Sequence, residues 1–232
     1  MARQAIILAA GMGTRLGRPF PKPLTELGGG HSIMHQQISK LREALPGIRI
    51  TVVVGFKRDL IMEAFPDVLF AYNELYDQTN TCKSLLRGLQ LSADGGALWL
   101  NGDVVFDIAI LERIDSLMSQ DQSFVCVNTA AVGEEEVKYT VDESGHIKEL
   151  SKTVSHPLGE AIGINYVSQS DKGALLTALA TVDDQDYFER GIEVAVAEDG
   201  LQVLPVDISD LYAVEVDFEE DLARAKELAG DE

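Results

Sequence analysis

The feature that most constrains this chain is an apolar run at residues 5–10 that opens into a glycine-rich loop. The run Ala-Ile-Ile-Leu-Ala-Ala contains no polar residue, which indicates a strand buried on both faces, as in the parallel sheet of an α/β protein. The segment that follows contains two glycines, a hydroxyl group and two cations: Gly11, Gly13, Thr14, Arg15 and Lys22. Such a loop presents backbone N–H groups to phosphate, and its guanidinium and ammonium groups add positive charge. We therefore expect residues 8–24 to bind a triphosphate.

Other kinds of glycine-rich loop do not fit these residues. A P-loop needs four residues between its glycines and then Gly-Lys-Ser/Thr, which is absent. The dinucleotide pattern G-x-G-x-x-G fails because position 16 is leucine and Gly17 comes one residue late. A protein kinase would need an H-R-D loop, which is also absent. The Pro21-Lys22-Pro23 element restricts the backbone around its lysine and makes the loop more specific than a plain strand–helix turn.

The composition limits the partners of the chain. Its 232 residues are 46% hydrophobic and 25% charged, with a formal net charge of -19. This acidity disfavours a nucleic acid or an anionic membrane as partner, because both attract clustered Lys and Arg. No apolar stretch approaches the roughly 18 residues that span a bilayer, and no signal-peptide pattern is present. Cys82 and Cys126 lack metal-type spacing, so we expect inert thiols and a cytoplasmic location.

Apolar runs alternate with helical periodicity through the first half of the chain. The expected strands cover residues 5–10, 50–55, 68–72, 97–101 and 124–128. The expected helices cover residues 32–45, 59–65, 81–91 and 108–118. This alternation predicts an α/β fold with a doubly wound, mostly parallel, Rossmann-like sheet. Such sheets bind ligands at the carboxyl ends of their strands, where the glycine-rich loop and Gly102-Asp103 can meet.

The second half of the chain has a different pattern. A hairpin is expected at residues 137–141 and 146–150, followed by strands at 159–166 and 201–206 and helices at 171–179 and 187–197. A strand at 213–216 and a helix at 219–228 end the series. We interpret residues 1–232 as one domain with three parts: an NTP-binding core (1–130), a small inserted α+β acceptor-binding lobe (about 131–210), and a closing strand and helix (211–232).

The loop string Leu8-Ala9-Ala10-Gly11-Met12-Gly13-Thr14-Arg15, with Pro21-Lys22-Pro23, resembles the consensus loop of the sugar-nucleotidyltransferase superfamily. Further segments resemble its short bacterial branch of phosphocholine, inositol-phosphate and phosphonate cytidylyltransferases: residues 79–85, 101–106, 159–164, 186–189 and 215–217. The resemblance implies a Mg²⁺-dependent enzyme that moves CMP from CTP to a small phosphorylated or phosphonate acceptor and releases pyrophosphate. Phosphocholine-like, aminoethylphosphonate-like and polyol-phosphate acceptors all stay open. Members of the family often dimerise, so a homodimer is a further expectation.

The same resemblance implies roles in the nucleotide site. The implied nucleotide-binding residues are Leu8, Ala9, Ala10, Gly11, Gly13, Thr14, Arg15, Lys22, Asn80, Ser84, Gly102 and Asp103. Arg15 and Lys22 are the implied catalytic cations, and Lys22 stabilises charge on the α-phosphate. Asn80 and Ser84 are implied to read a pyrimidine base, but Asn80 fits the N-cap of the helix at 81–91 equally well.

Three carboxylates are implied as Mg²⁺ ligands. Asp103 follows a buried strand and Gly102, which suits an oxygen ligand at a strand end. Glu215 and Asp217 share one face of an extended segment, because side chains there alternate. In so acidic a chain, each of these residues also fits an ordinary solvated position. Asp107 is better interpreted as the N-cap of the helix at 108–118.

The acceptor site has the least support from the residues. The resemblance implies that it contains Lys138, Lys152, Tyr187, Phe188 and Glu189. A lysine there would hold the acceptor phosphate or phosphonate, and the aromatic pair with Glu189 would form a partial site for a cationic group. The aromatic side chains fit the core of the small lobe as well.

Two other functions stay open. One is a sugar-1-phosphate nucleotidyltransferase that uses UTP or another NTP, which the short chain makes less expected. The other is a catalytically silent nucleotide-binding regulatory homologue. The presence of Arg15, Lys22, Asp103 and Asp217 together argues against the silent homologue.

Overall fold

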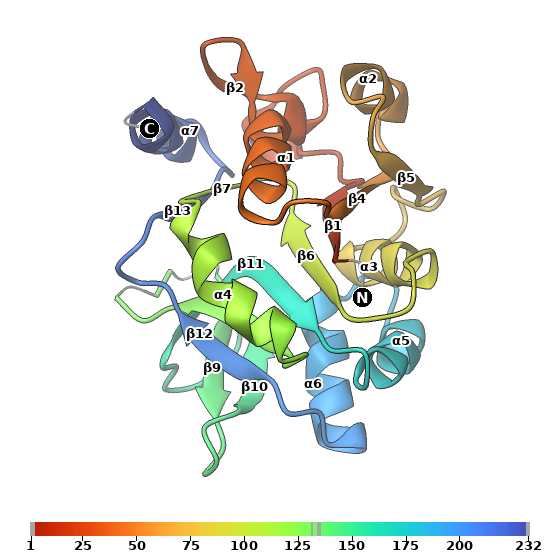
Figure 1. Cartoon of the computed structure of the whole chain (residues 1–232), viewed down its shortest axis with the longest axis vertical. Coiled ribbons are helices and arrows are strands. Elements are labelled where there is room, and N and C mark those ends of the chain that lie inside the picture. The colour runs from red at the N-terminus through yellow and green to blue at the C-terminus, as the bar shows by residue number, and fades with distance from the viewer. Residues whose placement is uncertain (1–2, 131, 134–135, 231–232) are drawn as a thin grey trace.

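The computed structural model describes residues 3–130, 132–133 and 136–230, and for Thr14 the backbone only. A nine-stranded sheet forms the centre of the molecule (Figure 1). Four parallel strands lie side by side in the order β6, β1, β4 and β5. Their bounds are Ala97–Asn101, Gln4–Ala9, Arg49–Val54 and Leu69–Tyr72. Because every residue of β1 is buried, the first strand lies in the interior of the sheet, as its apolar run predicts.

The sheet continues past β6 through a reversed strand. β11 (Gly159–Val167) is antiparallel both to β6 and to β8 (Phe124–Asn128), and β12 (Leu204–Asp207) adds parallel to β8. A hairpin of β9 (Lys138–Val141) and β10 (Ile147–Ser151) joins the first residues of β11. The register of β11 shifts around Gly163, whose φ is +66°. The shift marks a bend in β11 at Gly163, which lies beside Asn101, the last residue of β6.

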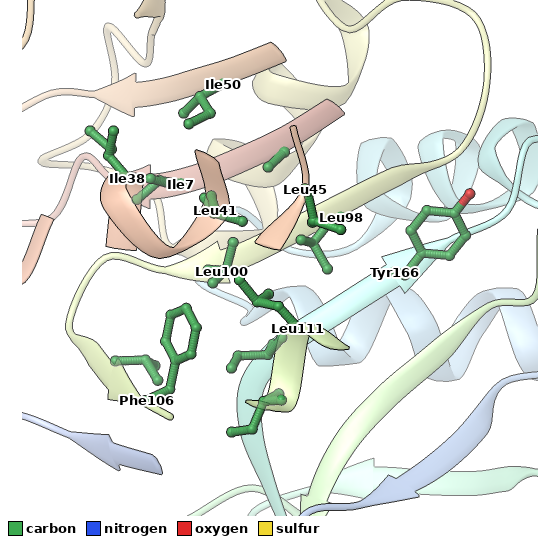
Figure 2. Close-up of a cluster of buried hydrophobic side chains, with 14 of the residues drawn as sticks. Ile7, Ile38, Leu41, Leu45, Ile50, Leu98, Leu100, Phe106, Leu111 and Tyr166 are labelled. Carbon is green, nitrogen blue, oxygen red and sulfur yellow. The ribbon is translucent and has the colours of Figure 1, made fainter. Parts of the chain in front are cut away.

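Helices cover both faces of the sheet, as a doubly wound fold requires. One core joins the sheet to α1 (Ile33–Ala44), α2 (Arg58–Ala64) and α4 (Ala109–Ser119), and Figure 2 shows part of it around Ile7, Leu41 and Leu100. The other core joins the opposite face to α3 (Thr81–Gln90), α5 (Lys172–Thr181) and α6 (Phe188–Asp199). Alternate residues of β1 enter the two cores, because side chains of a strand point to opposite faces.

A third, smaller core closes the carboxyl end of the sheet. β7 (Val104–Phe106) pairs antiparallel with β13 (Ala213–Glu215), and α7 (Glu219–Gly230) packs beside them and beside β2 (Glu26–Gly28). β2 in turn pairs with β3 (His31–Ser32). This arrangement brings β13 and the residues after it to the loop that follows β6. No helix in the described ranges is both long and apolar enough to cross a membrane.

The predicted fold class is confirmed. Most predicted helices and strands agree with the structure to within one or two residues at each end. The strand expected at residues 201–206 is shorter and begins at Leu204, and the short strands β2, β3 and β7 were not predicted. Asp107 accepts a hydrogen bond from the Ala109 N–H at 2.9 Å, at the start of α4. The division of the chain at residues 130 and 210 stays a prediction, and β9, β10, β11 and β12 belong to the same sheet as β1.

Candidate active site

The glycine-rich loop leaves β1 at the carboxyl edge of the sheet. Gly13 has a φ of +59°, which favours glycine, and a Cβ there would lie 3.0 Å from the Cβ of Lys22. A short 3-10 turn at Lys22–Leu24 follows an extended Pro21, and Pro23 is buried within it. The N–H of Leu24 donates to the Pro21 carbonyl at 2.9 Å. The two prolines therefore fix the turn that carries Lys22 and aim its side chain back across the loop.

Lys22 bridges two carboxylates that lie far away in the sequence. Its Nζ donates to Asp103 Oδ2 at 2.8 Å and to Asp217 Oδ1 at 2.6 Å, and its side chain is only 11% exposed. Arg15 donates to the other oxygen of Asp217 at 2.6 Å. Burial by itself would lower the pKa of Lys22, but the two carboxylates outweigh it, so the pKa is raised. Lys22 therefore stays charged at the meeting point of three chain segments.

The backbone around Asp103 is held from two sides. The Gly102 N–H donates to the Leu8 carbonyl at 2.9 Å, and a Cβ on Gly102 would lie 2.6 Å from that carbonyl oxygen. The Asp103 carbonyl accepts from the Val216 N–H at 3.0 Å. Glycine is thus required for the approach of the β6 end to β1, and Asp103 is fixed between β1 and the segment after β13, which carries Asp217.

Two cavities adjoin at this point. The first, of about 120 Å³, is lined by the loop and the turn: Leu8, Ala9, Gly11, Gly13, Lys22, Pro23, Gly102 and Asp103. The second, of about 180 Å³, extends toward β11 and α6 and shares Leu8, Gly102 and Asp103 with the first. The predicted residues Arg15, Lys152, Tyr187, Phe188, Glu189, Glu215 and Asp217 all line this second cavity. A ligand in one cavity would therefore meet a ligand in the other beside Asp103.

The second cavity is lined by several carboxylates, of which Glu189 is buried and Glu136 and Glu215 are half-buried. Burial, together with the charges of Asp103 and Glu136, raises the pKa of Glu215 well above its usual value. Burial raises the pKa of Glu189 to about 7, and it also raises the pKa of Glu136. Glu189 Oε2 has no hydrogen-bond partner among the described atoms. These groups lie where a positively charged ligand would restore their ionised forms.

Lys152 and Glu215 line this second cavity from different segments of the chain. Lys152 Nζ lies 5.1 Å from the centre of the Tyr187 ring. Glu215 accepts a hydrogen bond from the Asn101 side chain at 3.2 Å, and the bend at Gly163 makes room for this pair. A Cβ on Gly163 would lie 2.7 Å from Glu215 Oε1.

Some of the predicted site residues lie outside both cavities. Asn80 caps α3, where its side-chain oxygen accepts from the Thr81 N–H at 2.8 Å. Ser84 is buried and accepts from the Asn73 side chain at 3.1 Å, and Lys138 donates to the Lys152 carbonyl at 3.2 Å. The N-cap role of Asn80 is thus confirmed, whereas the base-reading and acceptor roles of these three residues stay predictions. Ala10 is buried and accepts from the Phe56 N–H, and the Thr14 side chain lies outside the described atoms.

Several residues of the site were not predicted. Glu136 lines the second cavity from the segment before β9, and no motif marked it. Asn101 lies in a segment whose family resemblance was noted, but its bond to Glu215 depends on the pairing of β13 with β7. Gly163 belongs to another such segment, and a glycine inside an expected strand is typical of a bulge. Its position could therefore have been read from the sequence.

The carboxylates fit a hard divalent cation. Asp103 and Asp217 both contact the same ammonium nitrogen, so their oxygens lie within two hydrogen-bond lengths of each other. Carboxylate oxygens are the protein ligands that Mg²⁺ prefers. Across the residues described, no three His, Cys, Asp or Glu side chains form a ready-made metal centre. The two aspartates would have to turn from Lys22 toward an incoming cation.

Comparison with known proteins identifies a family. A family model described as "MobA-like NTP transferase domain" matches residues 5–158. CMP-5'-(3-aminopropyl)phosphonate synthase of Streptomyces rubellomurinus is 32% identical over 124 residues, which are 48% of this chain and 19% of that protein. The bifunctional protein GlmU of Acidithiobacillus ferrooxidans is 33% identical over 135 residues, 58% of this chain and 29% of the relative. The chain thus spans less than a third of the length of these two curated relatives.

Solved structures share the whole fold. The inositol-1-phosphate CTP transferase from T. maritima matches with a TM-score of 0.80 and 19% identity, covering 99% of this chain and 95% of that one. The CTP:phosphocholine cytidylyltransferase LicC from Streptococcus pneumoniae matches with a TM-score of 0.75 and 19% identity, covering 99% and 100%. A UDP-glucose pyrophosphorylase matches with a TM-score of 0.75 and 15% identity, covering 100% and 99%. At these identities the matches establish the fold alone.

Proposed function

This chain belongs to the MobA-like NTP transferase family, and on that basis we propose that it transfers CMP from CTP to a small phosphorylated or phosphonate acceptor. The reaction releases pyrophosphate and uses Mg²⁺. The names of an aminopropylphosphonate relative and of two CTP-dependent structural neighbours support CTP and a small acceptor. These proteins share the fold or part of the sequence, so their substrates serve here as hypotheses.

The observation that carries the proposal is the meeting of two cavities at Asp103, with Lys22 beside it. The loop cavity suits the phosphates of a nucleotide, because it is lined by the glycine-rich loop and Lys22. The second cavity suits an acceptor whose phosphate oxygen approaches from the side of Asp103 and Asp217. Transfer between two bound anions needs this close placement and cations that offset the charge of the phosphates.

The chemistry assigns a part to each charged group. An acceptor phosphate or phosphonate oxygen attacks the α-phosphorus of CTP, a new P–O bond forms, and the bond to the β-phosphate breaks as pyrophosphate leaves. Lys22 and Arg15 neutralise the negative charge that gathers at the α-phosphate. Asp103 and Asp217, with Glu215 behind them, would hold Mg²⁺. When bound, the metal ion supplies further charge neutralisation and aligns the phosphates.

The second cavity favours an acceptor with a positively charged end. Glu136 and Glu189, which are not among the proposed Mg²⁺ ligands, line this cavity, and each has its pKa raised by burial. An ammonium group among these carboxylates would restore their charged forms, whereas a neutral polyol would leave them unpaired. Lys152, which lines this cavity beside Tyr187, is a cation that could bind the acceptor phosphonate or phosphate. We therefore rank aminoalkylphosphonates and choline-like phosphates above inositol phosphate.

A sugar-1-phosphate nucleotidyltransferase is the second candidate. It is supported by the UDP-glucose pyrophosphorylase, whose TM-score equals that of the phosphocholine enzyme. The buried carboxylates speak against it, because a sugar phosphate brings no positive charge to them. The fold by itself does not separate the two.

A substrate panel tests both candidates. The purified chain is incubated with Mg²⁺, one of CTP, UTP, ATP or GTP, and one of 2-aminoethylphosphonate, phosphocholine, inositol 1-phosphate or glucose 1-phosphate. Pyrophosphate release and the nucleotide product are measured. We expect CTP with an amine-bearing acceptor to give the highest kcat/KM. Preference for UTP and glucose 1-phosphate would replace this proposal by the second candidate, and no Mg²⁺-dependent pyrophosphate from any pair would favour the silent homologue.

A further inference from the structure

Helix α1 sends one amide side chain into the core beneath the Asp103 turn. Gln37 is fully buried, although glutamine is usually exposed in globular proteins. Its Nε2 donates to the Asn101 carbonyl at 2.8 Å and to the Val104 carbonyl at 2.8 Å. Both partners are carbonyl oxygens, so only the NH₂ group can face them, and both of its protons are used.

The two carbonyls that Gln37 holds flank the Gly102-Asp103 dipeptide on either side. Asn101 is the last residue of β6 and Val104 the first of β7, so one amide group joins the ends of two strands across the turn. The Gly102 N–H of this turn is held by the Leu8 carbonyl, and the Asp103 carbonyl is held by the Val216 N–H. Gln37 thereby completes the set of contacts that fixes where the Asp103 carboxylate emerges.

The helix that carries Gln37 is itself firmly anchored. Ser32 caps its first turn by accepting from the His35 N–H at 3.2 Å, and Met34, Ile38 and Leu41 are buried in the core around the amide. Because α1 is held in place by these contacts, Gln37 can fix the position of the turn relative to the helix. In the described structure Gln37 Oε1 accepts no hydrogen bond, so the polar contacts of the side chain are those to the two carbonyls.

We propose that Gln37 is a positioning residue that sets the Asp103 carboxylate for binding the metal–nucleotide complex. The inference rests on the proposed function, in which Asp103 is a metal ligand. Without the two hydrogen bonds, the Asn101 and Val104 carbonyls would seek other donors, and the turn between them would sample several conformations. A metal site with a mobile ligand binds its ion more weakly, while an acceptor held by the far side of the second cavity is affected less.

Lys40 provides a matched control one turn along the same helix. It is also buried, and its Nζ donates to the Phe106 carbonyl of β7 at 2.6 Å and to the Tyr212 hydroxyl at 3.0 Å. Lys40→Met thus removes a buried donor on α1 that binds β7 at Phe106, away from the Asp103 turn. Substitution of either residue would reduce packing or stability, whereas only substitution of Gln37 should weaken metal binding.

The experiment compares wild type, Gln37→Met, Gln37→Asn and Lys40→Met as purified whole chains. Gln37→Met keeps the length of the side chain and removes both donors, and Gln37→Asn keeps an amide that is too short to reach both carbonyls. Mn²⁺ binding in the presence of CTP is followed by electron paramagnetic resonance. Amide hydrogen exchange is measured over residues 100–106, and the KM for the acceptor is taken from pyrophosphate release.

We expect both Gln37 variants to raise the Kd for Mn²⁺ at least tenfold and to speed exchange at residues 102–104, with the acceptor KM within about threefold of wild type. Lys40→Met should leave the Kd for Mn²⁺ within about twofold. Unchanged Mn²⁺ binding in a folded Gln37 variant, or an equal loss in Lys40→Met, would overturn the positioning role. Should Gln37→Met fail to fold, Gln37→Asn decides by the same criteria.

Failure of the proposed function is distinguishable from failure of this inference. If wild type releases no pyrophosphate with any substrate pair, the proposed function fails, and the Mn²⁺ and exchange measurements still compare the variants without turnover. Exchange at residues 102–104 that is as slow in the Gln37 variants as in wild type would reject the positioning role by itself.

Discussion

Replacing Lys22 by methionine separates its proposed catalytic role from its structural role. The substitution keeps the length of the side chain and removes the ammonium that holds Asp103 and Asp217 at 2.8 and 2.6 Å. We expect turnover to fall steeply while the chain stays folded. We also expect the apo protein to bind divalent cations more tightly, because the two carboxylates lose their internal counter-charge.

The size of each effect follows from the environment of the pair. Two unit charges 4 Å apart attract each other by about 4 kcal/mol at an effective dielectric constant of roughly 20. The Asp103 and Asp217 side chains are 24% and 26% exposed, so solvent screens part of this attraction. We therefore expect a loss of about 1–2 kcal/mol in the free energy of unfolding. Removal of one preorganised charge from the transition state typically lowers kcat by about 10²–10³-fold, or roughly 3–4 kcal/mol.

Three measurements on the same samples test this prediction. Pyrophosphate release gives kcat, urea unfolding gives the free energy of unfolding, and electron paramagnetic resonance of Mn²⁺ gives metal affinity without nucleotide. Arg18→Met is the control, because Arg18 lies in the same loop but pairs with Glu219 at the surface. We expect the control to change stability by no more than about 0.5 kcal/mol and to leave kcat unchanged.

A folded Lys22→Met protein with wild-type kcat would refute the reasoning. Such a result would mean that the ammonium serves only to neutralise the two aspartates in the empty site. Equal metal affinity in the variant and in wild type would refute the electrostatic part, because it would show that the carboxylates do not compete between lysine and cation.

Three further predictions concern the second cavity and α1. Glu189→Gln should flatten the dependence of the free energy of unfolding on pH. In wild type the Glu189 carboxyl has a pKa of about 7 when folded and of 4.5 when unfolded, so the free energy of unfolding should fall by about 3 kcal/mol as the pH rises between these values. Urea unfolding of both proteins at pH 4.5 and pH 7.5 measures this difference. Identical slopes for the two proteins would contradict a buried, protonated Glu189. Gly163→Ala should lower the free energy of unfolding by about 1–2 kcal/mol and raise the acceptor KM. The reason is that φ at Gly163 is +66° and the new Cβ would lie 2.6 Å from Asn101 Nδ2. An unchanged KM in a kinetic assay would show that Gly163 has no influence on acceptor binding. Ser32→Ala should lower the free energy of unfolding by about 1 kcal/mol, because α1 loses its N-cap, and urea unfolding measures this loss. A fall in kcat in the same variant would show that α1 influences the site through more than Gln37.

Local features of the chain were readable from the sequence. An uninterrupted apolar run predicts a strand buried on both faces, so β1 could be located. Glycine widens and proline restricts the backbone conformations of its own segment, so the loop and the turn of Lys22 could be located as well. The position of Asp103 after a buried strand followed in the same way. These predictions depend on neighbours within a few residues, and such contacts are encoded in the local order of residues.

The composition of the site was decided by the tertiary structure. The reversal of β11 between β6 and β8, and the pairing of β13 with β7, are contacts between segments far apart in the sequence. They accompany the meeting of Lys22 with Asp217, 195 residues away, and the placement of Glu136 in the second cavity. Periodicity tells which face of a strand is buried, but it does not tell which strand becomes its neighbour, because that choice depends on the packing of the whole sheet. The sequence by itself determined the α/β class and the position of the glycine-rich loop, and the assembled sheet determined which charges meet there.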